Sequence, residues 1–125
     1  MFNNKVILVT GGTGSFGKKF TKHILDNYKP KKIIIFSRDE LKQFELQKTL
    51  STKKYKNLRY FIGDIRDYER LFLATQDCNF IVHTAALKQV PSSEYNPTEC
   101  INTNIHGSEN VIKCAIHNNI DKVIA

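Results

Sequence analysis

The sequence predicts an α/β fold, a doubly wound parallel sheet with five strands in the order 3-2-1-4-5. Five short apolar runs alternate with stretches in which apolar residues recur at helical spacing. A glycine-rich turn separates the first run from the first helical stretch. The length of 125 residues, with 41% hydrophobic and 25% charged residues, fits one globular unit. We therefore expect residues 1–125 to form a single domain.

The first β-α-β unit spans residues 5 to 37. Residues 5–10 have unbroken Val, Ile and Leu content, which is typical of a strand buried on both faces of a parallel sheet. A helix follows the glycine turn and ends before Pro30. Residues 32–37 are again solidly apolar and form the second predicted strand.

The middle of the chain repeats this alternation. Ser37 and Glu40 have the spacing of a capping box, which predicts a helix that continues to about Leu50. A polar, lysine-rich loop then leads into a third strand at residues 58–62. Asp67 is expected to cap a short helix, and a fourth strand follows at residues 80–84.

The last predicted helix starts at Asn96, Pro97 and Glu99, with Asn96 as the cap and Pro97 in the first turn. Residues 122–125 open a fifth strand. The helical spacing predicts one buried stripe, formed by Ile101, Ile105, Ser108, Ile112, Ala115 and Ile116.

The composition limits the partners. The net charge is +7, but the lysines are scattered, and their two denser groups, near residues 29–32 and 53–56, fall in predicted loops. We expect a solvated face there and no nucleic-acid partner. The apolar runs are far shorter than a membrane span, so no membrane partner is expected. The three cysteines are odd in number and widely spaced, which favours a reduced, cytoplasmic setting. No second pair of ligands accompanies Cys114 and His117, so no metal is expected.

The glycine turn carries the strongest functional signal. Gly11, Gly14 and Gly17 have a G-x-x-G-x-x-G spacing at the first β-α junction. Such glycines allow a tight turn, a close approach of backbone N–H groups to a pyrophosphate, and close packing of helix on strand. The pyrophosphate would lie at the amino end of the next helix. We therefore predict a dinucleotide site.

The end of the second strand selects the cofactor. An acidic residue there is typical of NAD sites, whereas this chain has Ser37 and Arg38, with Lys42 one helical turn beyond. A hydroxyl and a guanidinium suit a 2′-phosphate, which favours NADP. The alternatives are that Ser37 only caps a helix, that Arg38 is solvated, or that Asp39 draws Arg38 away.

Two further strand ends face the same edge. The side chain of Asp64 and the backbone N–H of Ile65 could bind an adenine edge, or form an ordinary turn. We expect His83 to be buried and satisfied by a backbone carbonyl. Small side chains at Ala85 and Ala86 would let the ribose and pyrophosphate approach the backbone. A loop containing Lys88 should face the nicotinamide and a substrate, although a surface lysine is the simpler interpretation. Thr103 and Asn104 are polar residues of the last helix that could contact this loop or the cofactor from below.

These motifs together resemble the extended short-chain dehydrogenase/reductases, with a Rossmann-like fold, and within them the inverting UDP-N-acetylglucosamine 4,6-dehydratases of polysaccharide and flagellin-sugar biosynthesis. The resemblance runs the whole length of the chain. The glycine turn is generic to the superfamily, and the more specific segments are residues 36–42 and 85–91. Thr84 departs from the alanine common in the family and adds a hydroxyl to a tight place.

The resemblance implies particular roles. The NADP-binding residues would be Gly11, Thr13, Gly14, Ser15, Phe16, Gly17, Ser37, Arg38, Asp39, Lys42, Asp64, Ile65, Ala85, Ala86, Lys88, Thr103 and Asn104. Lys88 would also contact the UDP-sugar. The family reaction moves a hydride from C4 of the sugar onto NADP⁺, eliminates water across C5 and C6, and returns the hydride to C6 with inversion at C5. The resemblance also implies a homo-oligomer for the full-length enzyme.

The family's acid/base motifs, a Ser/Thr-Asp-Lys segment after the fifth strand and a Tyr-x-x-x-Lys pair on the next helix, would begin just after Ala125. Tyr28 and Lys32 have the second spacing, but they straddle Pro30 at the end of the first helix, so we interpret them as a chance match. We therefore expect a truncated, NADP-binding part of a 4,6-dehydratase that is inactive alone, with no catalytic residue in this chain. A stand-alone nucleotide-binding or regulatory module that works with a separate chain is the alternative. A fragment that does not fold stably is a third possibility.

Overall fold

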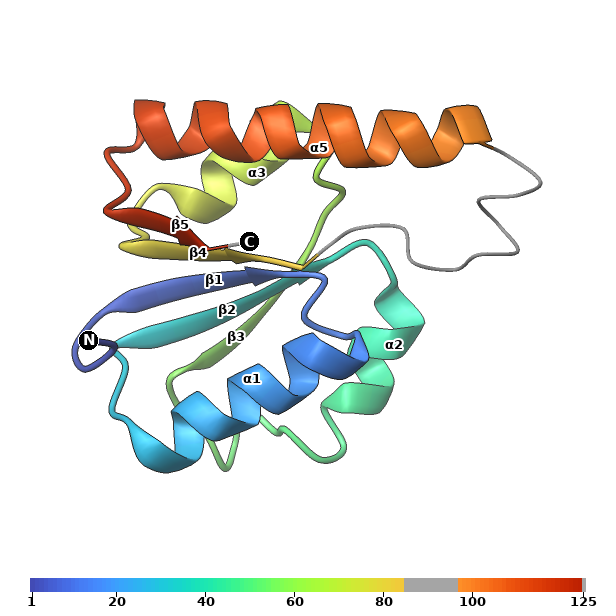
Figure 1. The fold of residues 1–125 in the computed structure, drawn as a ribbon. Helices are drawn as coiled ribbons and strands as arrows, with labels where there is room; N and C mark the ends of the chain where they lie inside the picture. Colours follow the sequence, from blue (N-terminus) through green and yellow to red (C-terminus); the bar gives the residue numbers. More distant parts are fainter. Residues whose placement is uncertain (85–96, 125) are drawn as a thin grey trace.

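The structure is a computed structural model that describes residues 1–84 and 97–124, with side chains described for 1–84 and 106–124. Parallel strands form one sheet in the order β3-β2-β1-β4-β5, as predicted (Figure 1). The elements are β1 Val6–Thr10, α1 Ser15–Asn27, β2 Lys32–Ser37, α2 Glu40–Leu46, β3 Leu58–Ile62, α3 Tyr68–Thr75, β4 Phe80–His83, α5 Pro97–His117 and β5 Lys122–Ile124.

The central strand, β1, is buried along its whole length. It pairs with β2 on one side and with β4 on the other, so that Val9 lies between Ile35 and Val82. Helices cover both faces of the sheet, which explains why the strand sequences are continuous apolar runs. Strand positions were therefore predictable from these apolar runs.

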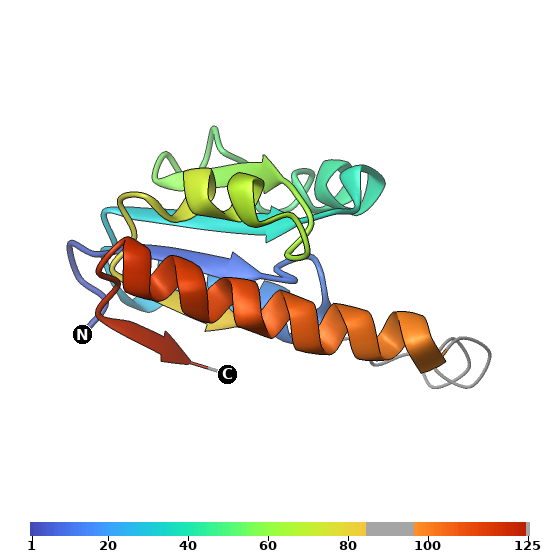
Figure 2. The same ribbon diagram turned by 90° about the horizontal axis from the view of Figure 1, so that it is seen from above.

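Two helical layers enclose the sheet. Helices α3 and α5 lie on one face, and α1 and α2 lie on the other (Figures 1 and 2). On the first face, Leu71 and Val111 pack with Leu8 and Ile81. The core on the second face contains Ile24 of α1 and Leu46 of α2 together with strand residues. Each face is thus a separate apolar core.

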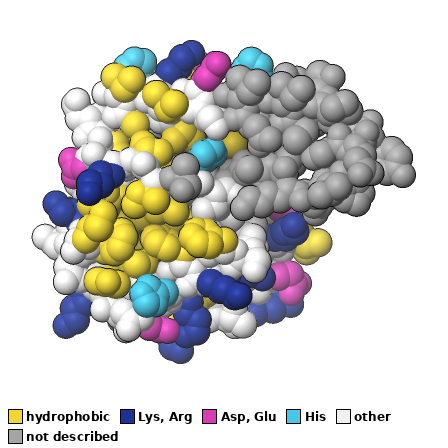
Figure 3. All heavy atoms as spheres, in the orientation of Figure 1, with side chains coloured by type: hydrophobic (Ala, Val, Ile, Leu, Met, Phe, Trp, Pro, Cys, Tyr) yellow, Lys and Arg dark blue, Asp and Glu magenta, His cyan; other side chains and the backbone are white. Residues whose placement is uncertain are grey.

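The sheet ends at β5, whose three residues are only partly covered. Val123 is 39% exposed. Figure 3 shows hydrophobic side chains at the surface between α5 and α1, where β4 and β5 lie in Figure 1. This side of the molecule is the least protected part of the described fold.

The buried stripe predicted for α5 is wrong in its described half. Ile112 and Ile116 are exposed, whereas Gly107, Val111 and Cys114 are buried. These three residues are spaced by four and three positions and face α3 and the sheet. The predicted stripe also included Ile101 and Ile105, whose side chains lie outside the described residues.

Gly107 is needed because α5 passes directly over Ile65. A Cβ at Gly107 would lie 2.3 Å from Ile65 Cδ1. Only glycine fits where α5 comes closest to Ile65, and the periodicity of apolar residues does not reveal this requirement.

The predicted cap of α2 is also wrong. Ser37 is the last residue of β2 and is buried, so its hydroxyl lies inside the sheet layer. The cap is Asp39, whose side chain accepts a hydrogen bond from the backbone N–H of Lys42 at 3.0 Å. The helix ends at Leu46 and is followed by turns, so it is shorter than predicted. In contrast, the predicted Asp67 cap of α3 is confirmed by its bond from the Arg70 N–H.

Within the described residues, none of the helices combines the length and the apolar character that a bilayer span requires.

Candidate functional site

The carboxyl ends of the strands meet at one edge of the sheet, which Figure 1 shows at the arrow tips. Backbone hydrogen bonds join these ends across neighbouring strands. Gly11 N–H donates to Phe36 C=O at 2.9 Å, and Gly63 N–H donates to Ser37 C=O at 2.9 Å. The structure therefore brings together the glycine turn, the end of β2 and the Gly63-Asp64 turn, as the sequence predicted.

The glycine turn is shaped by two positions without space for a side chain. A Cβ at Gly17 would lie 2.6 Å from Gly12 Cα and 2.7 Å from the Gly11 carbonyl oxygen. A Cβ at Gly12 would lie 2.6 Å from Ile35 Cγ2. Gly11 has a φ of 64°, a conformation that favours glycine. The prediction did not include Gly12 among the site residues, although it stands in the same glycine run.

Gly14 differs because it is exposed and a Cβ there would be less crowded than at Gly12 or Gly17. The nearest atom to a Cβ there would be the Gly11 carbonyl oxygen, at 3.3 Å, and the residue is exposed. Gly14 is the N-cap of α1 and supplies no side-chain hydrogen bond, and the first turn of the helix contains no acidic residue. The amino end of α1 is thus suited to an anion that approaches its backbone.

Three other predicted residues surround this helix start. Thr13 is partly exposed and Ser15 is exposed. Phe16 is 58% exposed and stacks on Phe20. These residues flank or follow Gly14 in the sequence. The hydroxyls of Thr13 and Ser15 and the ring of Phe16 are accessible to a ligand at the start of the helix.

The end of β2 is organised by Gln43 of α2. Its side-chain amide donates to Ser37 Oγ at 2.9 Å, to Ser37 C=O at 3.2 Å and to Phe61 C=O at 3.1 Å. Gln43 is 3% exposed, so this buried amide fixes α2 against β2 and β3. Gln43 was not predicted as a site residue, because a single glutamine in a polar helix has no pattern that marks it as buried.

Arg38 follows Ser37 and is half exposed. Its guanidinium lies 3.7 Å from the carboxylate of Asp64, rather than against Asp39. Asp39 is occupied as the cap of α2, and Lys42 is exposed in the first turn of that helix. The cationic groups of Arg38 and Lys42 therefore stand at the end of β2 with access to solvent.

Asp64 lies in a turn stabilised by Arg66. The Arg66 guanidinium donates to both carboxylate oxygens, at 2.8 to 3.2 Å, and its backbone N–H donates at 2.9 Å. Partial burial acts to raise the pKa of Asp64, but these hydrogen bonds and the charges of Arg66 and Arg38 outweigh it and hold the pKa below its ordinary value. The carboxylate is charged and already has partners.

Ile65 is 5% exposed, and its side chain belongs to the core. Its carbonyl accepts a hydrogen bond from Asn110 of α5 at 2.8 Å. An adenine contact at this residue would have to use the main chain, which agrees with the predicted role of its backbone N–H.

His83 is held by two hydroxyls, so the predicted backbone-carbonyl partner is wrong. Its Nδ1 lies 2.8 Å from Thr10 Oγ1, and its Nε2 lies 3.3 Å from Ser108 Oγ on α5. Thr10 Oγ1 accepts the Thr84 N–H at 2.9 Å and can donate its own proton to Nδ1. Burial lowers the pKa of His83, which agrees with a neutral ring.

Thr84 turns its hydroxyl toward the sheet. Its Oγ1 donates to the Thr10 carbonyl. The hydroxyl that departs from the family pattern is thus engaged with β1 in this structure.

The remaining predicted residues cannot be placed in the site. Ala85, Ala86 and Lys88 lie outside the described residues. Thr103 and Asn104 lie in α5, but their side chains are not described.

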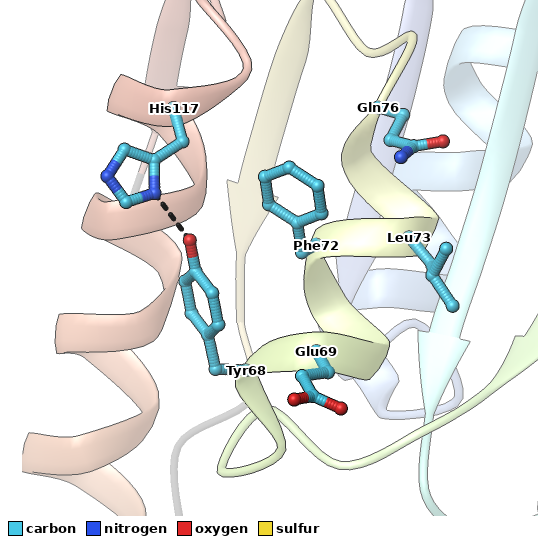
Figure 4. A pocket seen from close by; sticks show the side chains of 6 residues that line it. All are labelled: Tyr68, Glu69, Phe72, Leu73, Gln76 and His117. Carbon is cyan, nitrogen blue, oxygen red and sulfur yellow. Dashed lines mark hydrogen bonds between the residues drawn. The ribbon is translucent and has the colours of Figure 1, made fainter.

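A separate hollow of about 690 Å³ lies on the outer surface of α3 and α5. Figure 4 shows Tyr68 pointing toward His117, with its hydroxyl 2.5 Å from His117 Nδ1, and Phe72 between the two helices. These residues come from helix faces and not from the carboxyl edge of the sheet. The hollow is therefore distinct from the predicted dinucleotide site.

Comparison with known proteins supplies the family. Residues 7–125 match the family described as "Polysaccharide biosynthesis protein". The chain belongs to this family.

Relatives of this chain include enzymes that are named for reactions of UDP-sugars. It is 59% identical over 125 residues to a UDP-N-acetylglucosamine 4,6-dehydratase (inverting) of Campylobacter jejuni, which covers 100% of this chain and 36% of the relative. It is 46% identical over 128 residues to a UDP-glucose 4-epimerase of Rickettsia rickettsii, covering 99% of this chain and 36% of the relative. The chain thus spans about a third of the length of these relatives.

Solved structures show the same fold. The X-ray structure of Pen from Bacillus thuringiensis has 45% identity and a TM-score of 0.91, covering 98% of this chain and 37% of that one. A UDP-N-acetylglucosamine 4-epimerase from Methanobrevibacter ruminantium, in complex with UDP-N-acetylmuramic acid, has 28% identity and a TM-score of 0.79, covering 97% and 37%. The polysaccharide biosynthesis family shares this doubly wound sheet with nucleotide-sugar epimerases.

Proposed function

We propose that this chain is the NADP-binding part of a nucleotide-sugar 4,6-dehydratase that acts on UDP-N-acetylglucosamine. The observation that carries the proposal is the glycine turn, where Gly12 and Gly17 bring the amino end of α1 against the sheet while Gly14, the N-cap, is exposed to solvent. The 59% identity to the C. jejuni dehydratase supports the choice of reaction. The family description "Polysaccharide biosynthesis protein" supports a role in the biosynthesis of surface polysaccharide or flagellin sugars, and we propose a cytoplasmic location.

The proposed cofactor contacts follow the edge of the sheet. The backbone of residues 13–16 would hold the pyrophosphate, helped by the helix dipole. Arg38 and Lys42 would bind the 2′-phosphate, because both cations face solvent at the end of β2. The turn at Asp64 and Ile65 would receive the adenine through main-chain groups. When bound, NADP⁺ supplies the hydride acceptor of the family reaction.

Several assignments extend this proposal beyond the described side chains. Ala85 and Ala86 would contact the middle of the cofactor, Thr103 and Asn104 would complete the pocket, and Lys88 would contact cofactor and UDP-sugar. The Asp-Lys and Tyr-x-x-x-Lys groups would have to come from elsewhere, so we propose that residues 1–125 bind the cofactor without turning over a sugar nucleotide. We also propose that the full-length enzyme is a homo-oligomer.

Part of a UDP-sugar 4-epimerase is a second candidate. The 46% identity to the R. rickettsii epimerase favours it over unrelated activities. Both reactions would use the same dinucleotide site, so the cofactor contacts above apply to either.

Parallel calorimetric titrations with NADP⁺ and NAD⁺ test the proposal. We expect saturable binding of NADP⁺ that is tighter than binding of NAD⁺, and no consumption of UDP-N-acetylglucosamine. Equal, weak binding of both dinucleotides would contradict the NADP assignment. Release of a dehydrated or epimerised sugar by the pure chain would contradict its proposed inactivity and would also distinguish the two candidate reactions.

A further inference from the structure

The amino-terminal edge of the sheet, opposite the glycine turn, carries a concentration of positive charge. Three segments reach this edge: the chain before β1, the α1–β2 connection and the α2–β3 connection. We call their lysines the lysine edge: Lys5, Lys29, Lys31, Lys32, Lys53, Lys54 and Lys56. Arg59, near the start of β3, adds an eighth cation. Figure 3 shows Lys and Arg side chains along the left margin, where the amino ends of the strands lie in Figure 1.

Backbone hydrogen bonds hold the three segments side by side. The N–H groups of Lys31 and Lys32 donate to the Lys5 carbonyl at 2.9 and 3.3 Å. Asn57 donates from its side chain to the Pro30 carbonyl at 3.1 Å, and its own carbonyl accepts from Ile33 N–H at 2.9 Å. The lysines therefore form one surface, although up to about fifty positions separate them in the sequence.

This surface has little negative charge of its own. Within segments 1–5, 26–32 and 51–59, which the structure describes fully, Asp26 is the sole acidic side chain. Lys22 binds Asp26 at 2.6 Å, and Tyr55 contacts its other oxygen at 3.4 Å. The other half of the edge, near β4 and β5, has Asp77 and Asp121 beside Lys122. The positive potential is thus confined to the β1–β2–β3 half.

The side chains of the lysine edge suit a surface with spread negative charge, such as lipid headgroups, better than they suit a nucleic acid. Seven of its eight cations are lysines, which act as hydrated point charges, whereas arginine is preferred for bidentate phosphate recognition. Single-stranded nucleic acid typically binds in a groove with exposed stacking rings. Here Tyr55 lies under Lys54, at 5.2 Å, and Tyr28 packs edge-on against Phe2 with 36% of its surface exposed. A partly exposed tyrosine beside lysines is typical of a protein surface that contacts lipid headgroups.

We propose that the lysine edge docks peripherally on an anionic lipid surface. The expectation of no membrane partner rested on the lack of a spanning segment, and a peripheral contact needs none. The orientation leaves the glycine turn free, because the two edges lie at opposite ends of the strands. Docking would therefore hold the candidate dinucleotide site away from the lipid and open to solution.

Sedimentation with lipid vesicles tests the proposal on the 125-residue chain. We expect binding to vesicles of phosphatidylcholine with phosphatidylglycerol, no binding to phosphatidylcholine alone, and release by added salt. The triple variant Lys31→Gln, Lys53→Gln, Lys56→Gln should bind about a hundredfold more weakly, since each lysine near an anionic leaflet contributes about fivefold. The matched control Lys18→Gln, Lys19→Gln, Lys113→Gln removes the same charge from exposed positions on α1 and α5 and should keep most of the binding.

Three results would overturn the proposal: no binding to the anionic vesicles, equal losses in the two triple variants, or preferential binding of mixed-sequence DNA in competition with the vesicles. Far-ultraviolet circular dichroism and thermal unfolding check that each variant is folded. NADP⁺ titration of the same variants keeps this test separate from the proposed function, because a chain that does not bind NADP⁺ can still bind vesicles.

Discussion

At the scale of single residues, the candidate site combines exposed cations with a half-buried histidine. Arg38 lies beside Asp64, and Asp64 is held more closely by Arg66. A 2′-phosphate would therefore compete with one weak ion-pair contact for the Arg38 guanidinium. His83, in contrast, lies between β1 and α5, and its two hydrogen bonds connect Thr10 of β1 with Ser108 of α5.

Replacing Arg38 by alanine should reduce NADP⁺ affinity by about tenfold to a hundredfold, because a charge-assisted contact to phosphate contributes about 1.5–3 kcal/mol. NAD⁺ has no 2′-phosphate, so its affinity should change little. Parallel calorimetric titrations measure both effects. Arg59→Ala, on the opposite edge, is the matched control, and an equal loss of NADP⁺ affinity in that variant would refute a specific role for Arg38.

His83 should make stability depend on pH. Because burial lowers its pKa from the ordinary value of 6.5, the unfolded chain binds a proton more readily than the folded one. The contribution of neutral His83 to the free energy of unfolding is fully present above pH 6.5, and it is lost as the pH falls through the lowered pKa. Chemical unfolding at a series of pH values should show this decrease, and His83→Gln should flatten it. His106→Gln, at an exposed position, should retain the slope; a slope unchanged in His83→Gln would exclude His83 as its origin.

At the scale of elements, the sequence predicted the strands better than the helix contacts. Strand positions are marked by continuous apolar runs, because both faces of the sheet are covered. Helix faces are marked by spacing alone, and spacing selected Ile112 and Ile116 while the packed face uses Gly107 and Cys114. Small residues at close contacts carry no hydrophobic signal. The glycine turn was predictable, whereas Gln43 and the hydroxyl partners of His83 depend on contacts between distant segments.

Two glycine variants should show separate effects on NADP⁺ binding and on the free energy of unfolding: Gly14→Ala and Gly17→Ala. The Cβ at Gly17 would meet backbone at 2.6 Å, so this variant should lose about 1–3 kcal/mol of unfolding free energy. Gly14 has a φ of −75°, which alanine can adopt, and its Cβ would lie 3.3 Å from the Gly11 carbonyl oxygen, so Gly14→Ala should be less destabilising than Gly17→Ala. Its methyl group should nevertheless obstruct the approach of a phosphate and weaken NADP⁺ binding by about tenfold or more.

Denaturant unfolding and titration of both variants provide the measurements. A Gly14→Ala variant that binds NADP⁺ normally would show that the ligand does not approach this backbone.

The crossing of α5 over the β3–α3 turn can be tested by a double-mutant cycle. Gly107→Ala should destabilise the chain by about 1–3 kcal/mol, because the new Cβ would meet Ile65 Cδ1. Ile65→Val removes that atom, so the double variant should be less destabilised than the sum of the two single changes. Additive free energies of unfolding would show that the two residues do not share this contact.

At the scale of the whole molecule, protection is uneven across the sheet. β1 is buried and has partners on both sides, whereas β5 has three residues, pairs only with β4 and is partly exposed. We expect amide hydrogen exchange to be slowest in β1 and fastest, among the strands, in β5. Exchange followed by mass spectrometry measures this order. Equal protection of β5 and β1 would indicate that another chain or copy covers β5 in solution.

The strand order also affects how the chain can fold during synthesis. β1, β2 and β3 are neighbours both in sequence and in the sheet, so they can pair as soon as they are made. The second partner of β1 is β4, and Thr10 pairs with His83, which is translated 73 residues later. Until then, one side of the innermost strand exposes its backbone groups. A ribosome-bound intermediate of the first three strands would thus be the species most prone to aggregate and to recruit chaperones.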